Sequence, residues 1–303
     1  MTAAAPDPSP VTRPGSHRRV RPQLWLPIVG AVLVVVVAVA LIVVMRTPGQ
    51  APARPVGPAV AVPSPSPSAP PAKKAFVVVP PPAGLPVVDY DPAPAGFPAD
   101  PAPLSTAPLR EGLHATRLIG AYDAPGGRPV AFLAPDIRGV ELTMPIVERR
   151  SGWAAVLVPS TNRKIAWVPP GGWTTVVLRD QIIVRRKTHR LTWYRDGQLM
   201  RSWPVTLGVP ATPTPLGRTF IIGRSALRGA VYAGTDVLAL GSVPDDPSAL
   251  PPALRGAHTG IHTWHHDRAL GKNTSDGCIR LTKSGQQLLL RELRGGTEVV
   301  VLD

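Results

Sequence analysis

The chain has 303 residues, of which 40 are proline and 28 are glycine, and only 5% are aromatic. This composition excludes one continuous packed core along the whole length, because much of the chain lacks the apolar residues that a core needs. The formal net charge is +14, but the basic residues are scattered rather than clustered, which argues against a nucleic-acid partner.

The N-terminal segment predicts a membrane anchor. Residues 24–45, LWLPIVGAVLVVVVAVALIVVM, are 22 residues without a charge, and a helix of that length spans the roughly 30 Å of a bilayer's hydrocarbon core. Four arginines and one aspartate precede it in residues 1–23, so this basic tail is expected in the cytoplasm and the rest of the chain outside. A cleaved signal peptide is the alternative, but its apolar region is usually shorter and ends at a small-residue cleavage site.

Residues 46–108 predict an extended linker outside the membrane. Positions 47–108 contain 19 prolines, interrupted mainly by alanine, serine and valine. No periodic apolar face forms in such a sequence, and proline-rich linkers adopt extended polyproline conformations. We expect this stalk to carry the later domains away from the bilayer.

Residues 109–175 predict a small β domain. Short apolar alternations such as AYDAPGGRPVAFL and RKIAWVPPGGW are broken by proline, glycine and asparagine at close intervals, which is typical of strands joined by turns. The pattern resembles the SH3-like modules of bacterial envelope proteins, with Trp153 and Trp167 as core aromatics. Whether such a module binds a wall peptide or only packs its core stays open.

Residues 176–303 predict further strands and one helix. Asp196-Gly197 is a hairpin signal between strands at 191–194 and 198–205, and GRTFIIGR adds another strand. The segment KSGQQLLLREL, 283–293, is the predicted helix, with Thr282 as its N-cap and Gly295 closing it. TEVVVLD then returns as a final strand.

Cys278 is the only cysteine of the chain, so it forms no intramolecular disulfide. A small buried apolar residue or an intermolecular disulfide would explain it. Its setting, SDGCIR, favours a reactive thiol, because a neighbouring glycine leaves room for a substrate and successive N–H groups of a loop bind an oxyanion. A free thiol with a pKa near 8.5 is mostly protonated at neutral pH and needs a base. His262 is the candidate.

The segment HTGIHTW reads as a strand, with His258 and His262 on one face and about 13 Å apart. That spacing argues against a zinc ion shared by these two histidines, and no HExxH glutamate is present. His265 and His266 are expected on an exposed loop, and a metal site that includes them is the alternative. We expect neither a metal nor a cofactor.

The pattern GIHTW followed by GKNTSDGCIRL strongly resembles the L,D-transpeptidase catalytic domain of the YkuD type. That family places a strand histidine, a loop of about fifteen residues, and then Ser-x-Gly-Cys-hydrophobic-Arg or Asn; here sixteen positions separate His262 from Cys278. The order of the surrounding strands and helix is similar over roughly residues 176–303. The resemblance implies a mainly β protein whose last domain is a YkuD-like β-sandwich with one C-terminal helix.

The same resemblance implies the catalytic roles. Cys278 would be the nucleophile and His262 the base. The backbone carbonyl of Thr263 would orient the imidazole, and the N–H groups of Gly277 and Cys278 would form the oxyanion hole.

Three further residues have supporting roles by resemblance. Ser275 would brace the cysteine loop through a hydrogen bond. Arg280 would form a salt bridge within the fold or neutralise a substrate carboxylate, the first being the preferred interpretation. Asp276 departs from the family, which usually has His, Arg or Lys there. Pointing inward it would raise the thiol pKa, whereas in solvent it would be screened, and we expect the second.

The resemblance implies a bacterial enzyme of peptidoglycan synthesis. Cys278 would attack the third residue of a tetrapeptide stem, release D-alanine and pass the acyl group to another stem in a 3→3 cross-link. Carbapenems would acylate the same sulfur. With water as the acceptor, the site would be an L,D-carboxypeptidase.

Two other classes of protein compete with this interpretation. A papain-like cysteine peptidase usually has its cysteine before its histidine, the reverse of this chain. A catalytically silent wall-binding scaffold would use only the stalk and the small β domain. Whether the enzyme is a transpeptidase or a carboxypeptidase, we expect it in the bacterial cell membrane, with its catalytic domain in the cell-wall space.

Overall fold

The computed structural model describes residues 76–226, 229 and 232–303, which belong to one compact unit. Within these residues, no helix has the length and apolar character needed to cross a membrane. The predicted basic tail at 1–23, the predicted span at 24–45 and the first part of the predicted linker lie outside the described residues, so they stay predictions.

The predicted linker extends too far toward the C-terminus. Val88 and Phe97 are buried in the core of the small β domain, and the backbone of Val88 donates a hydrogen bond to the carbonyl of Phe132 at 2.8 Å. Ile165 donates in the same way to Pro98. The segment from about residue 86 to 108 is therefore a strap bound across the domain. A proline has no N–H to donate, but its carbonyl still accepts hydrogen bonds, and the apolar side chains beside it still pack.

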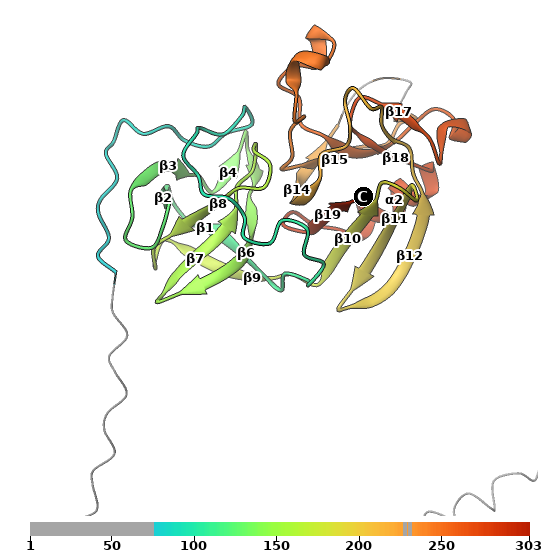
Figure 1. Cartoon of the computed structure of the whole chain (residues 1–303). Coiled ribbons are helices and arrows are strands. Elements are labelled where there is room, and N and C mark those ends of the chain that lie inside the picture. The colour runs from blue at the N-terminus through green and yellow to red at the C-terminus, as the bar shows by residue number, and fades with distance from the viewer. Residues whose placement is uncertain (1–75, 227–228, 230–231) are drawn as a thin grey trace, which may run out of the picture. The chain divides into compact units, whose positions relative to one another are not determined.

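The small β domain contains one seven-stranded sheet, drawn in green in Figure 1. Every pairing within it is antiparallel. Its strands, in their order across the sheet, are β3 (Pro129–Leu133), β2 (Ile119–Tyr122), β8 (Ile165–Val168), β7 (Trp153–Leu157), β6 (Thr143–Arg150), β1 (Glu111–Ala115) and β9 (Trp173–Val177). A two-residue pair, β4 (Asp136–Ile137) with β5 (Val140–Glu141), lies between β3 and β6 in the chain.

Both predicted core aromatics of this domain are buried. Trp153 is 1% exposed and packs edge-on against Tyr122, with ring centroids 5.1 Å apart. Trp167 is also buried, and Arg150 lies over its ring. The core role of the two tryptophans is confirmed, while the SH3-like assignment stays a prediction.

The C-terminal domain is built on an eight-stranded mixed sheet, coloured yellow to red in Figure 1. Its strands, in order, are β12 (Gln198–Pro204), β11 (Arg190–Arg195), β10 (Asp180–Arg185), β19 (Glu298–Leu302), β14 (Gly217–Ser225), β15 (Val237–Leu240), β16 (Gly260–Thr263) and β18 (Ile279–Leu281). A minor parallel pair joins β13 (Leu207–Gly208) to β17 (Asn273–Ser275).

The long strand β14 joins two halves of this sheet. Its first half, from Gly217 to Phe220, pairs with β19, and its second half, from Ile221 to Ser225, pairs with β15. The register shifts between Ile221 and Gly223, and such irregularities bend a strand and increase its twist. The two halves and the C-terminal helix share one apolar core, in agreement with the predicted sandwich-like, mainly β domain.

Local sequence signals set several of these elements. Asp196 and Gly197 both have positive φ angles, +50° and +82°, as a type I′ hairpin turn between β11 and β12 requires. Helix α2 (Lys283–Glu292) begins where predicted, with the hydroxyl of Thr282 accepting the N–H of Gly285 at 3.1 Å. The predicted closure at Gly295 is wrong. Leu293 caps the helix in an extended conformation, and the positive φ angle lies at Gly296.

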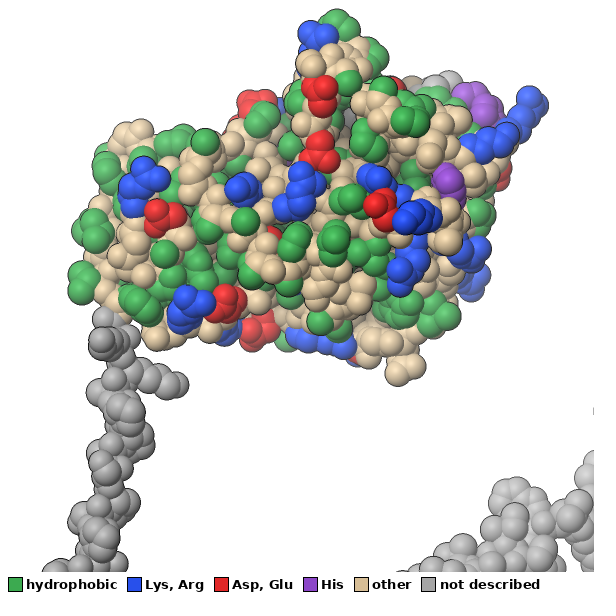
Figure 2. All heavy atoms as spheres, viewed as in Figure 1, with side chains coloured by type: hydrophobic (Ala, Val, Ile, Leu, Met, Phe, Trp, Pro, Cys, Tyr) green, Lys and Arg blue, Asp and Glu red, His purple; other side chains and the backbone are tan. Residues whose placement is uncertain are grey.

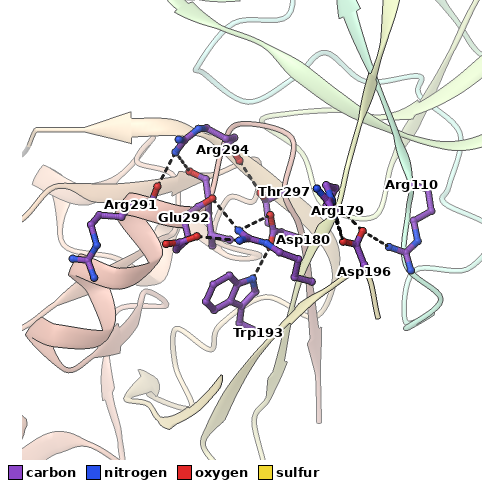
Figure 3. Close-up of polar contacts among 11 residues, drawn as sticks. Arg110, Arg179, Asp180, Trp193, Asp196, Arg291, Glu292, Arg294 and Thr297 are labelled. Atoms are coloured by element: carbon purple, nitrogen blue, oxygen red, sulfur yellow. Dashed lines mark hydrogen bonds and ion pairs between the residues drawn. The ribbon is translucent and has the colours of Figure 1, made fainter. Parts of the chain in front are cut away.

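An ion-pair network fixes the end of α2 to the β10–β11 hairpin. Arg195 donates to Asp180 at 2.9 Å and to Glu292 at 3.0 Å. The indole of Trp193 donates to Asp180 at 2.7 Å (Figure 3). This network orients the helix from its C-terminal end. On the face shown in Figure 2, basic and acidic side chains are interspersed, as expected from the sequence.

The strap also ties the two domains together through buried charges. Asp100 of the strap receives two hydrogen bonds from the guanidinium of Arg218 on β14, and the side chains are 0% and 5% exposed. Nearby, the fully buried Glu298 accepts the N–H of Leu109 at 3.1 Å and the amide of Gln181 at 2.8 Å. The small β domain is therefore anchored on the central strands of the C-terminal sheet.

Candidate active site

Two neighbouring parallel strands bring the predicted nucleophile and base to one side of the sheet. Strands β16 and β18 pair so that His262 lies opposite Arg280, and Cys278 immediately precedes β18. Side chains two residues apart on a strand share a face, so Cys278 is on the side of His262. A strand spacing of about 4.8 Å and a two-residue offset give a Cα separation of roughly 8 Å. Side chains at that separation are close enough to meet.

These side chains line a common cavity of about 230 Å³. Its floor is formed by the strand and loop residues His258, Thr259, His262, Trp264, Asp276, Cys278 and Arg280. Its wall comes from Tyr232 and from four apolar residues of the segment 244–257, which are Pro244, Leu250, Leu254 and Ala257. That segment contains two short 3₁₀ helices, η2 (Pro247–Ala249) and η3 (Pro252–Leu254), and projects in orange at the top of Figure 1.

The contact that orients the imidazole is present as predicted. Nδ1 of His262 lies 2.6 Å from the carbonyl oxygen of Thr263. A carbonyl only accepts, so this contact places the proton on Nδ1 and leaves the lone pair on Nε2. His262 therefore has the tautomer that a base for Cys278 needs.

The backbone around the sulfur has the form expected of an oxyanion site. Gly277 has a φ angle of +104°, a conformation that side chains with a Cβ rarely adopt. Within the described part of the chain, the N–H groups of Gly277 and Cys278 make no hydrogen bond. Ser275 is buried, and its hydroxyl donates to the carbonyl of Cys278 at 2.6 Å, which is the predicted brace of this loop.

The two charged residues beside Cys278 differ in their settings. Asp276 is exposed, as expected, although it also borders the cavity. The preferred prediction for Arg280, a salt bridge within the fold, is wrong for the described residues. The guanidinium instead stacks on Trp264, 3.6 Å from the ring centroid.

The other histidines of this segment have separate positions. His258 is buried, and its Nδ1 and Nε2 lie 2.5 Å and 2.6 Å from the carbonyls of Leu240 and Tyr90. Both of its nitrogens are thus engaged by backbone. His265 and His266 are exposed, as predicted.

Comparison with known proteins places the C-terminal domain in a family. Residues 179–301 match the L,D-transpeptidase catalytic domain family, YkuD, and the match contains all seven predicted site residues. The C-terminal domain belongs to this family. The "Putative L,D-transpeptidase YkuD" of Bacillus subtilis is 28% identical over 111 residues, which cover 37% of this chain and 58% of that protein. The protein of the same name from Bacillus licheniformis is 26% identical over 127 residues, which cover 42% and 67%.

Among solved structures, an L,D-transpeptidase from Mycobacterium smegmatis is 16% identical, with a TM-score of 0.35, and the match covers 52% of this chain and 80% of that one. The match with the Bacillus subtilis protein spans little more than half of that protein's length.

In this L,D-transpeptidase domain, burial sets the charges of the resting pair. Burial lowers the pKa of His262 from its ordinary 6.5 to about 4, and the positive charge of Arg280 acts in the same direction. Burial also raises the pKa of the Cys278 thiol. Both directions favour the uncharged forms, so at neutral pH the pair is an imidazole and a thiol. A thiol in this state attacks efficiently only if a base takes its proton, and the free lone pair on Nε2 of His262 is available for that.

Several residues that line this cavity were not predicted. Tyr232 packs edge-on against the His262 ring, with centroids 5.2 Å apart, and no sequence motif marks it. Trp264 directly follows the strand that contains His262. Its position beside a predicted base was the signal that could have indicated a cavity residue. The apolar residues of 244–257 come from a proline-rich loop whose position depends on tertiary structure.

We predict that the free energy of unfolding decreases as the pH falls from about 6.5 toward 4. Between these values the unfolded chain binds a proton that folded His262 does not, so stability rises with pH across this window. The difference between 6.5 and about 4 corresponds to roughly 3 kcal/mol. Burial lowers the pKa of His258 too, so His258 contributes to the same pH dependence. A plot of the urea unfolding midpoint against pH should therefore become less steep in His262→Gln, but not flat.

The exposed His265 provides the matched control for this measurement. His265→Gln should retain the wild-type slope between pH 4 and 6.5. A slope in His262→Gln as steep as that of the wild type would contradict the assignment.

Proposed function

We propose that this protein is a peptidoglycan L,D-transpeptidase that forms 3→3 cross-links through a thioester on Cys278. The observation that carries the proposal is the cavity shared by Cys278 and His262 on neighbouring strands of a YkuD domain. The tautomer of His262 and the unbonded N–H groups of the 277–278 loop supply the other parts that acyl transfer needs.

The chemistry balances with these groups alone. Sγ of Cys278 attacks the carbonyl carbon of the third stem residue, and its proton moves to Nε2 of His262. The developing oxyanion is stabilised by the N–H groups of Gly277 and Cys278. The bond to D-alanine then breaks as His262 returns the proton to the leaving amine. In the second half, an amine of another stem attacks the thioester and loses a proton to His262, and His262 returns that proton to the leaving sulfur.

The proposal includes the place where this chemistry occurs. The apolar segment 24–45 would anchor the chain in a bacterial cell membrane, with residues 1–23 in the cytoplasm. The proline-rich chain up to about residue 85 would hold the two domains in the cell-wall space. Carbapenems, whose strained ring carbonyl is an acyl donor, would acylate Cys278.

Incubation of the full-length protein with a disaccharide tetrapeptide tests this function. Mass spectrometry of the products should show 3→3 dimers together with free D-alanine. Tripeptides without dimers would assign an L,D-carboxypeptidase, with water as the acceptor. No release of D-alanine by the folded protein would contradict both activities and favour the wall-binding scaffold.

A further inference from the structure

One side of the active-site cavity is formed by a segment that has few polar attachments to its own domain. We call residues 243–257, which include the four apolar residues of the cavity wall, the lining segment. It projects from the domain in Figure 1, and between 245 and 256 only Leu250 is buried. Among the described residues, every hydrogen bond that joins this segment to the rest of the protein ends on Asn162 or Arg163. Both residues belong to the small β domain.

These two residues hold the start of the lining segment. The side-chain amide of Asn162 pairs with the backbone of Val243 in both directions: its nitrogen donates to the carbonyl at 2.7 Å, and its oxygen accepts the N–H at 3.1 Å. The guanidinium of Arg163 donates to Asp245 at 2.7 Å and to the carbonyl of Leu216 at 2.9 Å. Planar amide and guanidinium groups that are bound at two points have little freedom to turn. The start of the lining segment is therefore fixed by the preceding domain.

The strap holds the other end of the lining segment. His258 directly follows this segment and borders the same cavity. Its Nε2 lies 2.6 Å from the carbonyl oxygen of Tyr90, and the two rings stack with centroids 4.2 Å apart. Ser160 fixes the strap at this point, since its hydroxyl donates to the carbonyl of Asp89 at 2.5 Å and its carbonyl accepts the N–H of Ala93 at 2.9 Å.

A single loop of the small β domain thus acts on both ends. Ser160, Asn162 and Arg163 all lie in residues 158–164, between β7 and β8. Ser160 and Arg163 have positive φ angles, +64° and +55°. Residues with a side chain rarely adopt this conformation, and it persists only where the surrounding contacts require it.

We propose that the loop 158–164 is a positioning element of the active site. It sets the lining segment against the catalytic cavity directly through Asn162 and Arg163, and through the strap at His258. The small β domain thereby determines how well the donor peptide fits the cavity. The part of this inference that concerns turnover rests on the proposed function.

The loop should affect binding of the donor more than the chemical step. The lining segment supplies apolar surface to the cavity, whereas the His262 ring is oriented by Thr263 and the cysteine loop is braced by Ser275. Neither of these contacts involves the lining segment. Each hydrogen bond is worth about a 2- to 10-fold change in an equilibrium constant. Loss of the loop's contacts should therefore raise KM for the tetrapeptide and change kcat little.

Two measurements on the full-length protein test this role. The double variant Asn162→Ala, Arg163→Ala should raise KM about tenfold and keep kcat within about twofold of the wild type, as measured by release of D-alanine. Limited digestion with trypsin reports on the lining segment without any turnover, because Arg255 is the only lysine or arginine in it. Mass spectrometry should show faster cleavage after Arg255 in the double variant than in the wild type.

Asp245→Ala breaks part of the same junction from the other side. It removes the acceptor of Arg163 and leaves the small β domain unchanged, so it tests the inference even if the double variant does not fold. Asp245 is exposed, and its replacement should not prevent folding. KM should rise by a smaller factor than in the double variant, because the pair between Asn162 and Val243 remains.

Asp123→Ala is the matched control within the small β domain. It removes a hydrogen bond of a different loop, to the N–H of Arg128, and it should keep the wild-type KM and the wild-type cleavage after Arg255. The same wild-type behaviour in the folded double variant would overturn the positioning role, and so would a loss of kcat at unchanged KM. No release of D-alanine by the wild type would instead contradict the proposed function, and the trypsin comparison would still decide whether the loop holds the lining segment.

Discussion

Replacing Cys278 with alanine should abolish both acylation by a carbapenem and the release of D-alanine from a tetrapeptide. No other cysteine exists in the chain, so no second thiol accepts the acyl group. The wild-type protein should gain the whole mass of one carbapenem, because opening of the ring expels no leaving group, and Cys278→Ala should gain nothing. Intact-protein mass spectrometry detects the adduct, and peptide mapping places it on the segment that contains Cys278.

The fold itself should survive this substitution. Cys278 is only half-buried, and Ser275 contacts its backbone carbonyl rather than its side chain. We expect a loss of about 1 kcal/mol or less in the free energy of unfolding. Ser275→Ala is the informative companion, because it removes the brace and leaves the sulfur, and it should slow acylation without abolishing it. Residual turnover by a folded Cys278→Ala protein would reveal another nucleophile.

Local signals predicted the parts of the fold that depend on neighbouring residues. The Asp196-Gly197 turn requires two positive φ angles, and the Thr282 cap requires a hydroxyl three residues before a free N–H. Both requirements are visible in a short window of sequence. The error at Gly295 has a matching reason. Either of the two adjacent glycines, 295 and 296, satisfies the conformational preference, and Gly296, which lies against Thr143 and Leu178, is the one with the positive φ angle.

The strap could not be predicted in the same way. Its proline content indicates an extended chain, and from residue 86 the strap is irregular chain with turns at 95–96 and 103–104, but composition does not reveal whether such a segment is free or bound. Val88, Phe97 and Asp100 decide the matter, because they are buried only through partners far along the chain. Contacts at such sequence separations follow from topology and not from local pattern.

The candidate site also has one part that local sequence predicted and one part that depends on the folded chain. The histidine, the cysteine and their loop were predictable because one continuous segment, 259–281, contains them. The protonation states of the histidine and the cysteine were not predictable from that segment. The sequence suggests that an imidazole next to a thiol favours the thiolate, whereas burial of both groups favours the uncharged pair. Burial comes from Tyr232 and the 244–257 segment, which only the folded chain brings to the cavity.

The second large effect is expected at the junction of strap and sheet. Asp100→Asn keeps the size of the side chain but leaves the buried guanidinium of Arg218 without its counter-charge. Breaking a buried ion pair from one side typically costs about 3–5 kcal/mol, because the remaining charge stays in a poorly solvated position. Urea denaturation followed by tryptophan fluorescence should show this loss.

A surface pair of the same chemical type isolates the effect of burial. Asp196 also forms a close contact with Arg179, at 2.6 Å (Figure 3), but the two side chains are 46% and 64% exposed. Asp196→Asn should cost about 1 kcal/mol or less, because water screens the unpaired arginine. Removing both charges of the buried pair, with Asp100→Asn and Arg218→Met together, should recover much of the stability that the single change loses. If Asp100→Asn destabilises no more than Asp196→Asn, the junction is hydrated in solution and the strap is not held by a buried charge.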